Sequence, residues 1–138
     1  MEPTDTAPPA ARTDTGVLTV EASATVAHAA RVMSDHEVGA LVVTGADRRA
    51  VGIVTERDVL RDVVAPERPA GEVTVAEVMT ADLLSCTMAT AYPEARRLMA
   101  EHGIRHLPIL EDGRPVGMLS IRDVLTYELA RSRDGGGD

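Results

Sequence analysis

The chain lacks phenylalanine, tryptophan and lysine, and it contains one cysteine and two tyrosines. Its core must therefore be built from Val, Leu, Ile, Ala and Met, and aromatic platforms on which bases could stack are scarce. All 14 basic residues are arginine and face 22 acidic residues, which gives a net charge of −8 at pH 7. Because this charge repels polyphosphate backbones, we do not expect nucleic acid as a partner.

The sequence also shows no sign of an intramolecular disulfide, a membrane-spanning helix or a signal peptide. The single Cys86 cannot form an intramolecular disulfide, and no apolar run approaches the roughly 20 residues of a membrane-spanning helix. The opening residues, MEPTDTAPPAARTD, lack the apolar stretch and basic flank of a signal peptide. These features predict a cytoplasmic protein in a reducing environment, with no membrane partner.

Composition divides the 138 residues into tails, repeats and a linker. Residues 1–15 and 132–138 are rich in Pro, Thr, Asp or Gly and have no hydrophobic periodicity, which predicts two disordered tails. Between them we expect a first repeat over 16–66, a linker over 67–74 and a second repeat over 75–131.

The two repeats are indicated by two similar segments of sequence. The first copy reads VMSDHEVGALVVTGADRRAVGIVTERDVL and ends at Leu60; the second reads LMAEHGIRHLPILEDGRPVGMLSIRDVL and ends at Leu125. In each copy an amphipathic helical pattern precedes two short apolar runs that flank turn residues, and a second helical pattern follows. With a short extended entry, each copy reads β-α-β-β-α. We predict an α/β (α+β) fold of two pseudo-symmetric repeats packed through their sheets.

Each copy also places a hydroxyl residue three positions before an aspartate, at the start of its second helix. The pairs are Thr55 with Asp58 and Ser120 with Asp123. One interpretation is a capping box, in which the hydroxyl and the carboxylate bond backbone N–H groups of the first helical turn. This interpretation assigns the motif a structural role only.

A second interpretation of the same motif is a nucleotide cradle. A helix N-terminus offers N–H donors to a phosphate, the aspartate can accept hydrogen bonds from ribose hydroxyls, and an arginine stands beside it, Arg57 or Arg122. In addition, Gly52 and Gly117 lie within predicted strands, where glycine often marks the close approach of another backbone or of a ligand. Both interpretations stay open on the sequence.

The two copies resemble the cystathionine-β-synthase-type (CBS) domain, whose tandem pairs are called Bateman modules. The resemblance covers residues 16–130 and includes VAEVMT at 75–80. It implies a regulatory, ligand-sensing homodimer that binds AMP, ADP, ATP or S-adenosylmethionine in clefts between the repeats, requires no cofactor and acts on a separate, unidentified protein. The alternative is a dimerisation or protein-interaction module of the same fold without nucleotide binding.

The resemblance also implies which residues bind the ligand. They are the motif residues, the segments beside the first hairpin strand of each repeat and one residue in each entry segment: Thr55, Arg57, Asp58, Ser120, Arg122, Asp123, Val38, Gly39, Ala40, Ile104, Arg105, His106, Leu18 and Leu84.

The resemblance further implies that each cleft is formed by both repeats, with Ser120, Arg122 and Asp123 facing Val38–Ala40 of the other repeat. We expect the cleft that contains Asp123 to be the better site. The second repeat places Arg105 and His106 where some members of the family hold phosphates. The first repeat instead starts its helix with Glu56, whose carboxylate would repel a phosphate, whereas Ile121 stands at the matching position.

Catalysis is not expected. The four histidines, His28, His36, His102 and His106, form no metal or catalytic motif, and nothing in the sequence around Cys86 would lower the pKa of its thiol. A homodimer is expected on physical grounds as well, because two small repeats can hardly cover every apolar helix position, such as Ala30, Val32, Leu98 and Leu125.

Overall fold

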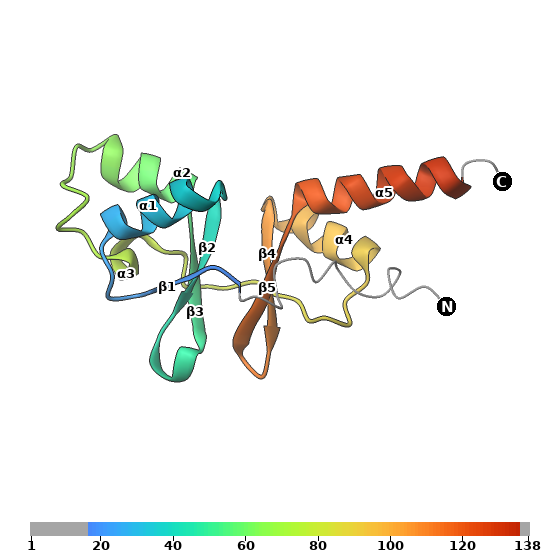
Figure 1. Ribbon diagram of the computed structural model, residues 1–138, viewed down its shortest axis with the longest axis horizontal. Helices are drawn as coiled ribbons and strands as arrows, with labels where there is room; N and C mark the ends of the chain where they lie inside the picture. Colours follow the sequence, from blue (N-terminus) through green and yellow to red (C-terminus); the bar gives the residue numbers. More distant parts are fainter. Residues whose placement is uncertain (1–16, 136–138) are drawn as a thin grey trace. The chain divides into compact units, whose positions relative to one another are not determined.

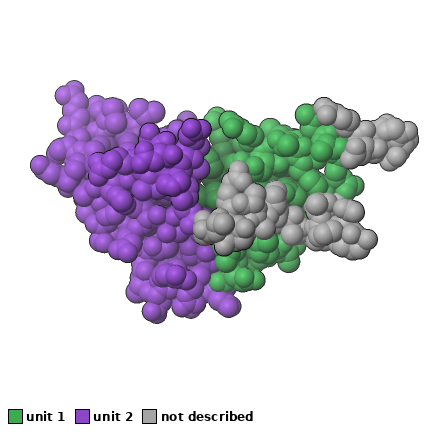
Figure 2. Space-filling model, in the orientation of Figure 1, with its two compact units in different colours: residues 1–16, 84–111, 116–138 green, residues 17–83, 112–115 purple. Residues whose placement is uncertain are grey.

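The structure is a computed structural model that describes residues 17–135 (Figure 1). Its residues group into two units, which are described separately (Figure 2). Unit 2 contains Val17–Leu83 and Asp112–Pro115, and unit 1 contains Leu84–Glu111 and the described residues from Val116 onward. The predicted N-terminal tail lies outside the described residues.

Unit 2 holds a three-stranded sheet and the helices that pack on it. The elements are β1 (Thr19–Glu21), α1 (Val26–His36), β2 (Ala40–Thr44), the 3-10 turn η2 (Ala46–Arg48), β3 (Ala50–Thr55), α2 (Glu56–Val59), the π-helical turn η3 (Leu60–Val64) and α3 (Val75–Val78). Strand β1 pairs in parallel with β2, and β2 pairs antiparallel with β3. Helices α1, α2 and α3 lie on the same side of this sheet (Figure 1).

Unit 1 contains a two-stranded hairpin with one helix before it and one helix after it. Residues around Cys86 form the expected extended entry, because Cys86 bridges in parallel to Ile109. The elements are α4 (Tyr92–His102), β4 (His106–Glu111), β5 (Arg114–Ser120) and α5 (Ile121–Gly135). The first two residues of β5, Arg114 and Pro115, group with unit 2. Helices α4 and α5 pack on each other, and an ion pair of 3.5 Å joins Arg96 to Glu128.

The ends of the first helix of each repeat follow from local chemistry. The Oγ1 atom of Thr25 accepts a hydrogen bond of 3.1 Å from the backbone N–H of His28, which caps the start of α1. Both helices end on a residue in the left-handed conformation, Glu37 at φ 55° after α1 and Gly103 at φ 63° after α4. Glycine adopts this conformation without strain, whereas glutamate does not.

Each unit has its own apolar core, free of phenylalanine and tryptophan as the composition requires. In unit 2 the core joins the sheet to α1 and to α3, with Val26, Leu41 and Val54 fully buried. In unit 1 it joins the hairpin to α4 and α5, with Leu107 and Val124 fully buried. No helix in residues 17–135 is long and apolar enough to cross a membrane.

The predicted β-α-β-β-α order is confirmed, and the predicted start of the C-terminal tail needs correction. Helix α5 continues to Gly135, so it includes the first residues of the C-terminal tail predicted to begin at 132; residues 136–138 are outside the described range. The segment Val75–Leu83 belongs to the second repeat in sequence but to unit 2 in space. Val75 and Val78 lie in the core of unit 2, which explains this placement.

Candidate functional site

The two hydroxyl–aspartate motifs lie where a hairpin strand runs directly into a helix. We call Thr55–Asp58, between β3 and α2, the first junction, and Ser120–Asp123, between β5 and α5, the second junction. Both aspartates are at the third helical position, so their carboxylates can reach back to the N–H of the capping residue. The capping interpretation is confirmed at both junctions by the hydrogen bonds described next.

At the first junction, both polar side chains are fully engaged. The Asp58 Oδ2 atom accepts from the Thr55 backbone N–H at 2.8 Å and from the Thr55 hydroxyl at 3.1 Å. The Thr55 hydroxyl oxygen in turn accepts from the Asp58 N–H at 3.2 Å. Asp58 is only 4% exposed, so its carboxylate is buried within a closed set of hydrogen bonds.

The other carboxylate oxygen of Asp58 is held by Arg61. The Nη2 atom of Arg61 donates to Asp58 Oδ1 at 3.0 Å, and the same guanidinium bonds both oxygens of Asp62. These bonds raise the pKa of Arg61, with the bond to Asp62 as the largest cause and Asp58 contributing. Both oxygens of the Asp58 carboxylate are therefore occupied within the protein.

Glu56 covers the predicted framing segment of the same repeat. Its backbone N–H donates to the Gly39 carbonyl at 3.0 Å, and its side chain folds back over Gly39. A methyl group at Gly39 would lie 2.7 Å from Glu56 Oε2. The carboxylate expected to disfavour a phosphate thus lies directly on the backbone of Gly39.

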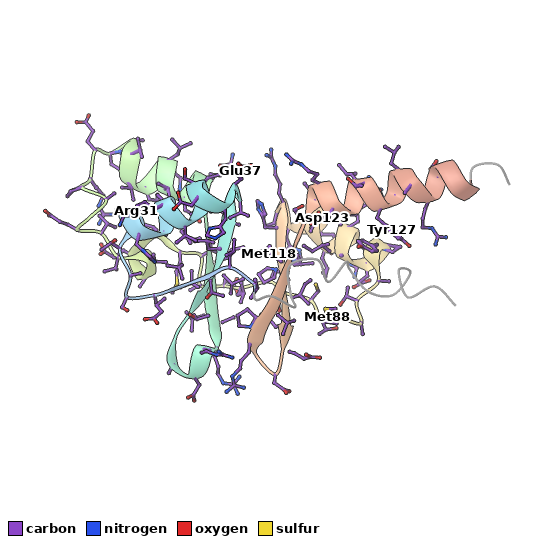
Figure 3. The ribbon with its side chains drawn as sticks, in the orientation of Figure 1. Arg31, Glu37, Met88, Met118, Asp123 and Tyr127 are labelled. Atoms are coloured by element: carbon purple, nitrogen blue, oxygen red, sulfur yellow. The ribbon has the colours of Figure 1, made fainter. Side chains whose placement is uncertain are left out.

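The second junction makes fewer internal bonds. The Asp123 Oδ2 atom accepts from the Ser120 N–H at 3.1 Å, and the Ser120 Oγ atom accepts from the Asp123 N–H at 3.1 Å. Among residues 17–132, nothing bonds Asp123 Oδ1, and the Ser120 hydroxyl donates to no acceptor. Asp123 lies half-buried at the N-terminal end of α5 (Figure 3). One acceptor and one donor are therefore uncommitted here.

Two arginines stand beside the second junction. The Arg105 carbonyl accepts a hydrogen bond of 2.8 Å from the Ile121 N–H, which fixes the start of β4 next to the start of α5. Arg105 and Arg122 are exposed, and neither forms an ion pair with another described residue. His106, next to Arg105, is half-buried and has interactions of its own. The second junction thus combines an uncommitted carboxylate oxygen with two available guanidinium groups.

The two tyrosines of the chain pack against each other in unit 1, near the second junction. The rings of Tyr92 and Tyr127 stack with centroids 3.9 Å apart, and the Arg131 guanidinium lies 5.9 Å from the Tyr127 ring centre. Burial, followed by the negative charge of Asp123, raises the pKa of Tyr92 to about 12.

The glycine of the first motif is explained by a backbone contact. A Cβ atom at Gly52 would lie 2.7 Å from the Thr80 carbonyl oxygen and 2.9 Å from the sulfur of Met79. Thr80 bridges antiparallel to Ile53 with hydrogen bonds of 3.0 and 2.9 Å in the two directions. Of the two reasons predicted for Gly52, close approach of another backbone is the one observed.

Most of the remaining predicted ligand-binding residues are apolar and contribute to packing. Leu18 and Val38 pack against the core of unit 2, and Ala40 is buried in β2. Leu84 and Ile104 pack against the core of unit 1. Arg57 is exposed on α2. The expected pairing of each junction with a framing segment of the other repeat stays a prediction.

The cysteine and two of the histidines, which could act as a nucleophile or as bases, make contacts typical of structural residues. Burial raises the pKa of the Cys86 thiol to about 11, which disfavours the nucleophilic thiolate. His36 and His102 each place Nδ1 at 3.0 Å from the carbonyl four residues earlier in their helix. Within the described part of the chain, no group of three His, Cys, Asp or Glu side chains could hold a metal ion.

Sequence reasoning missed Arg61. The signal was present, because an arginine three residues after an aspartate on a helix is within reach of its carboxylate. It was overlooked because Arg57, which is adjacent to Asp58, was the arginine expected to matter.

Comparisons with known proteins agree with the duplicated architecture. The family model "CBS domain" matches residues 13–65 and 75–130. A mitochondrial CBS domain-containing protein of Arabidopsis thaliana, CBSX3, is 39% identical over 114 residues, which are 80% of this chain and 55% of that protein. An uncharacterized 17.7 kDa protein of Acidianus ambivalens is 38% identical over 116 residues, 80% of this chain and 66% of that one.

A solved structure shows that the fold is also similar to that of CBS-domain proteins. A putative signal-transduction protein with CBS domains from Burkholderia ambifaria superposes with a TM-score of 0.77 at 38% identity, covering 83% of each chain. The chain spans less than two thirds of the length of the Arabidopsis and Acidianus relatives. The similarity in sequence and in structure therefore extends over both repeats of this chain.

Proposed function

The chain belongs to the CBS-domain family, and we propose that it is a regulatory module that binds adenosine-containing nucleotides at the second junction. One observation carries the proposal: Asp123 and Ser120 keep an acceptor and a donor uncommitted among the described residues, beside Arg105 and Arg122. The same proposal includes that the module regulates a separate protein and that it is located in the cytoplasm.

The chemistry of the second junction suits such a ligand. A carboxylate oxygen accepts hydrogen bonds from ribose hydroxyls, and charge-assisted bonds of this kind are the stronger ones. The N-terminal end of α5, a helix of 15 residues, favours a negative group, and Arg105 and Arg122 add two positive charges near it. The first junction lacks these features, since Glu56 lies over Gly39 and both Asp58 oxygens are occupied.

Isothermal calorimetry with adenosine, AMP, ADP, ATP and S-adenosylmethionine tests the proposal. Replacing Asp123 with alanine should abolish binding of adenosine and of every nucleotide. Arg105→Ala should weaken AMP or ATP by about ten- to a hundredfold, the range expected for one charge-assisted bond, and should change adenosine binding little. If Asp58→Ala abolishes binding while Asp123→Ala and Arg105→Ala leave it intact, the second junction is the wrong choice.

Arg97→Ala is the matched control for Arg105→Ala. Arg97 is also an exposed arginine of unit 1, and its guanidinium is held in ion pairs with Glu94 and Glu101 on α4. The two variants change the net charge equally. Weaker AMP binding in Arg97→Ala as well would attribute the effect to overall charge and would count against a specific site.

We also propose that the chain forms a homodimer through the second helix of each repeat. The largest exposed apolar side chains are two pairs spaced one turn apart, Leu60 and Val64 in unit 2 and Leu125 and Leu129 in unit 1. Leu60, Val64 and Leu129 are each more than half exposed, at 61%, 56% and 62%. Apolar helix positions of this size are costly to leave in water, so a second copy is the partner we expect to cover them.

Light scattering at micromolar concentration tests the dimer, with Leu129→Glu as the disrupting variant and Thr126→Glu as the control with the same charge on the same helix. A dimer that Leu129→Glu alone dissociates supports the proposal. A monomeric wild-type chain contradicts it. A dimer that binds none of the nucleotides would favour the alternative function, an interaction module of this fold without a ligand.

A further inference from the structure

The two repeats differ at the position three residues after the motif aspartate. After the hairpin the repeats are offset by 65 residues, so Arg61 corresponds to Thr126. Arg61 donates to Asp58 Oδ1 at 3.0 Å. Thr126 is exposed on α5, and no hydrogen bond joins it to Asp123 among the described residues. This one difference decides whether the second carboxylate oxygen of each aspartate is occupied.

We propose that Arg61 closes the first junction to nucleotide, so that the chain binds ligand at the second junction alone. This inference rests on the proposed function, since it concerns which of the two motifs serves that function. A ribose hydroxyl at the first junction would have to displace the Arg61 guanidinium from Asp58, whereas at the second junction the equivalent oxygen of Asp123 is uncommitted.

The geometry makes Arg61 a strong competitor for Asp58. The Asp58 side chain is 6% exposed while that of Arg61 is 60% exposed, so the guanidinium covers the carboxylate from the solvent side. Bonds to both oxygens of Asp62 hold the guanidinium in place at 3.0 Å each. Displacing it would break the bond to Asp58 and leave a nearly buried carboxylate to be satisfied by the ligand alone.

Glu56 reinforces the closure for anionic ligands. Its carboxylate lies over Gly39, at the start of the helix where a phosphate would bind. Ile121 at the matching position of the second repeat carries no charge. Arg61 therefore excludes the nucleoside part of a ligand from the first junction, and Glu56 excludes its phosphate.

Reciprocal exchange between the repeats tests the inference, with adenosine and AMP as probes in calorimetry. The variant Glu56→Ile/Arg61→Thr gives the first junction the residues of the second, and the number of sites per chain should rise from one to two. Thr126→Arg gives the second junction the closing arginine, and it should weaken adenosine binding by about ten- to a hundredfold. Thr126→Gln, which is long and polar but uncharged, should leave the affinity within about twofold.

The outcomes separate this inference from the proposed function. If the wild-type chain binds no nucleotide, the proposed function fails, and binding at the second junction fails with it. The closing role of Arg61 is then decided by the double variant, in which a gained site supports that role and no gained site overturns it. Two sites in the wild-type chain overturn it directly. One site in both the wild type and the double variant, with the variant melting as a folded protein, also overturns it.

Discussion

Replacing Asp58 with alanine should cost much more folding stability than replacing Asp123, although both residues cap the start of a helix. Asp58 accepts two hydrogen bonds from Thr55 and one from Arg61, and it is 4% exposed. Asp123 accepts one bond from Ser120 and is half-buried. Hydrogen bonds to charged groups contribute roughly 1.5–3 kcal/mol each and are not additive, whereas loss of a helix cap costs about 1 kcal/mol.

We therefore expect a loss of about 2–4 kcal/mol for Asp58→Ala and of about 1 kcal/mol for Asp123→Ala. Urea denaturation followed by circular dichroism measures both, and an unchanged m-value would show that only stability has changed. The variant Thr55→Ala should lose part of the same free energy of unfolding, because it removes the hydroxyl that accepts the hydrogen bond from the Asp58 N–H. Equal losses for the two aspartates would refute the reasoning, since the difference rests entirely on the bonds that Asp58 has and Asp123 lacks.

Three further predictions concern single side chains. Gly52→Ala should destabilise the chain by about 1–3 kcal/mol because its methyl group would overlap a backbone carbonyl, and Gly71→Ala, with open space around it, should not. Glu37→Gly should raise the melting temperature and Gly103→Glu should lower it, because both positions have positive φ. Burial raises the pKa of the Cys86 thiol from 9.0 to about 11, so its stabilising contribution is complete below pH 9 and is lost as the pH rises through 11. Iodoacetamide at pH 8 should therefore modify Cys86 slowly in the native chain and rapidly in urea.

The order of elements could be predicted because it depends on patterns that each copy repeats. The amphipathic helical pattern of the first copy corresponds to α1, and the apolar runs on either side of each turn correspond to the strands of each hairpin. Duplication strengthened these predictions, since a pattern that occurs twice in register is unlikely to arise from composition alone. The buried state of Cys86 was also predictable, because an isolated thiol in an apolar context usually packs as a small hydrophobic residue.

Features that depend on long-range contacts could not be predicted in the same way. The segment around Thr80 pairs with β3 and fixes the need for Gly52, yet nothing local in the sequence indicates that these backbones meet. The π-helical turn at Leu60–Val64 has no counterpart in α5, although the two helices begin with nearly the same residues. For Gly52 the deciding partner, the Thr80 backbone, lies in another part of the chain, whereas nothing in the structure explains the π-helical turn.

The sequence presented capping and ligand binding as competing interpretations of one motif, and the structure shows why they do not exclude each other. A carboxylate has two oxygens, and at each junction one of them, Oδ2, makes the cap. The other oxygen is free to serve a ligand unless a neighbouring donor takes it. The aspartate alone does not distinguish the two junctions of this chain, because both repeats carry it. The residue three positions later does distinguish them, because Arg61 bonds the second carboxylate oxygen of Asp58 and Thr126 forms no such bond with Asp123 among the described residues.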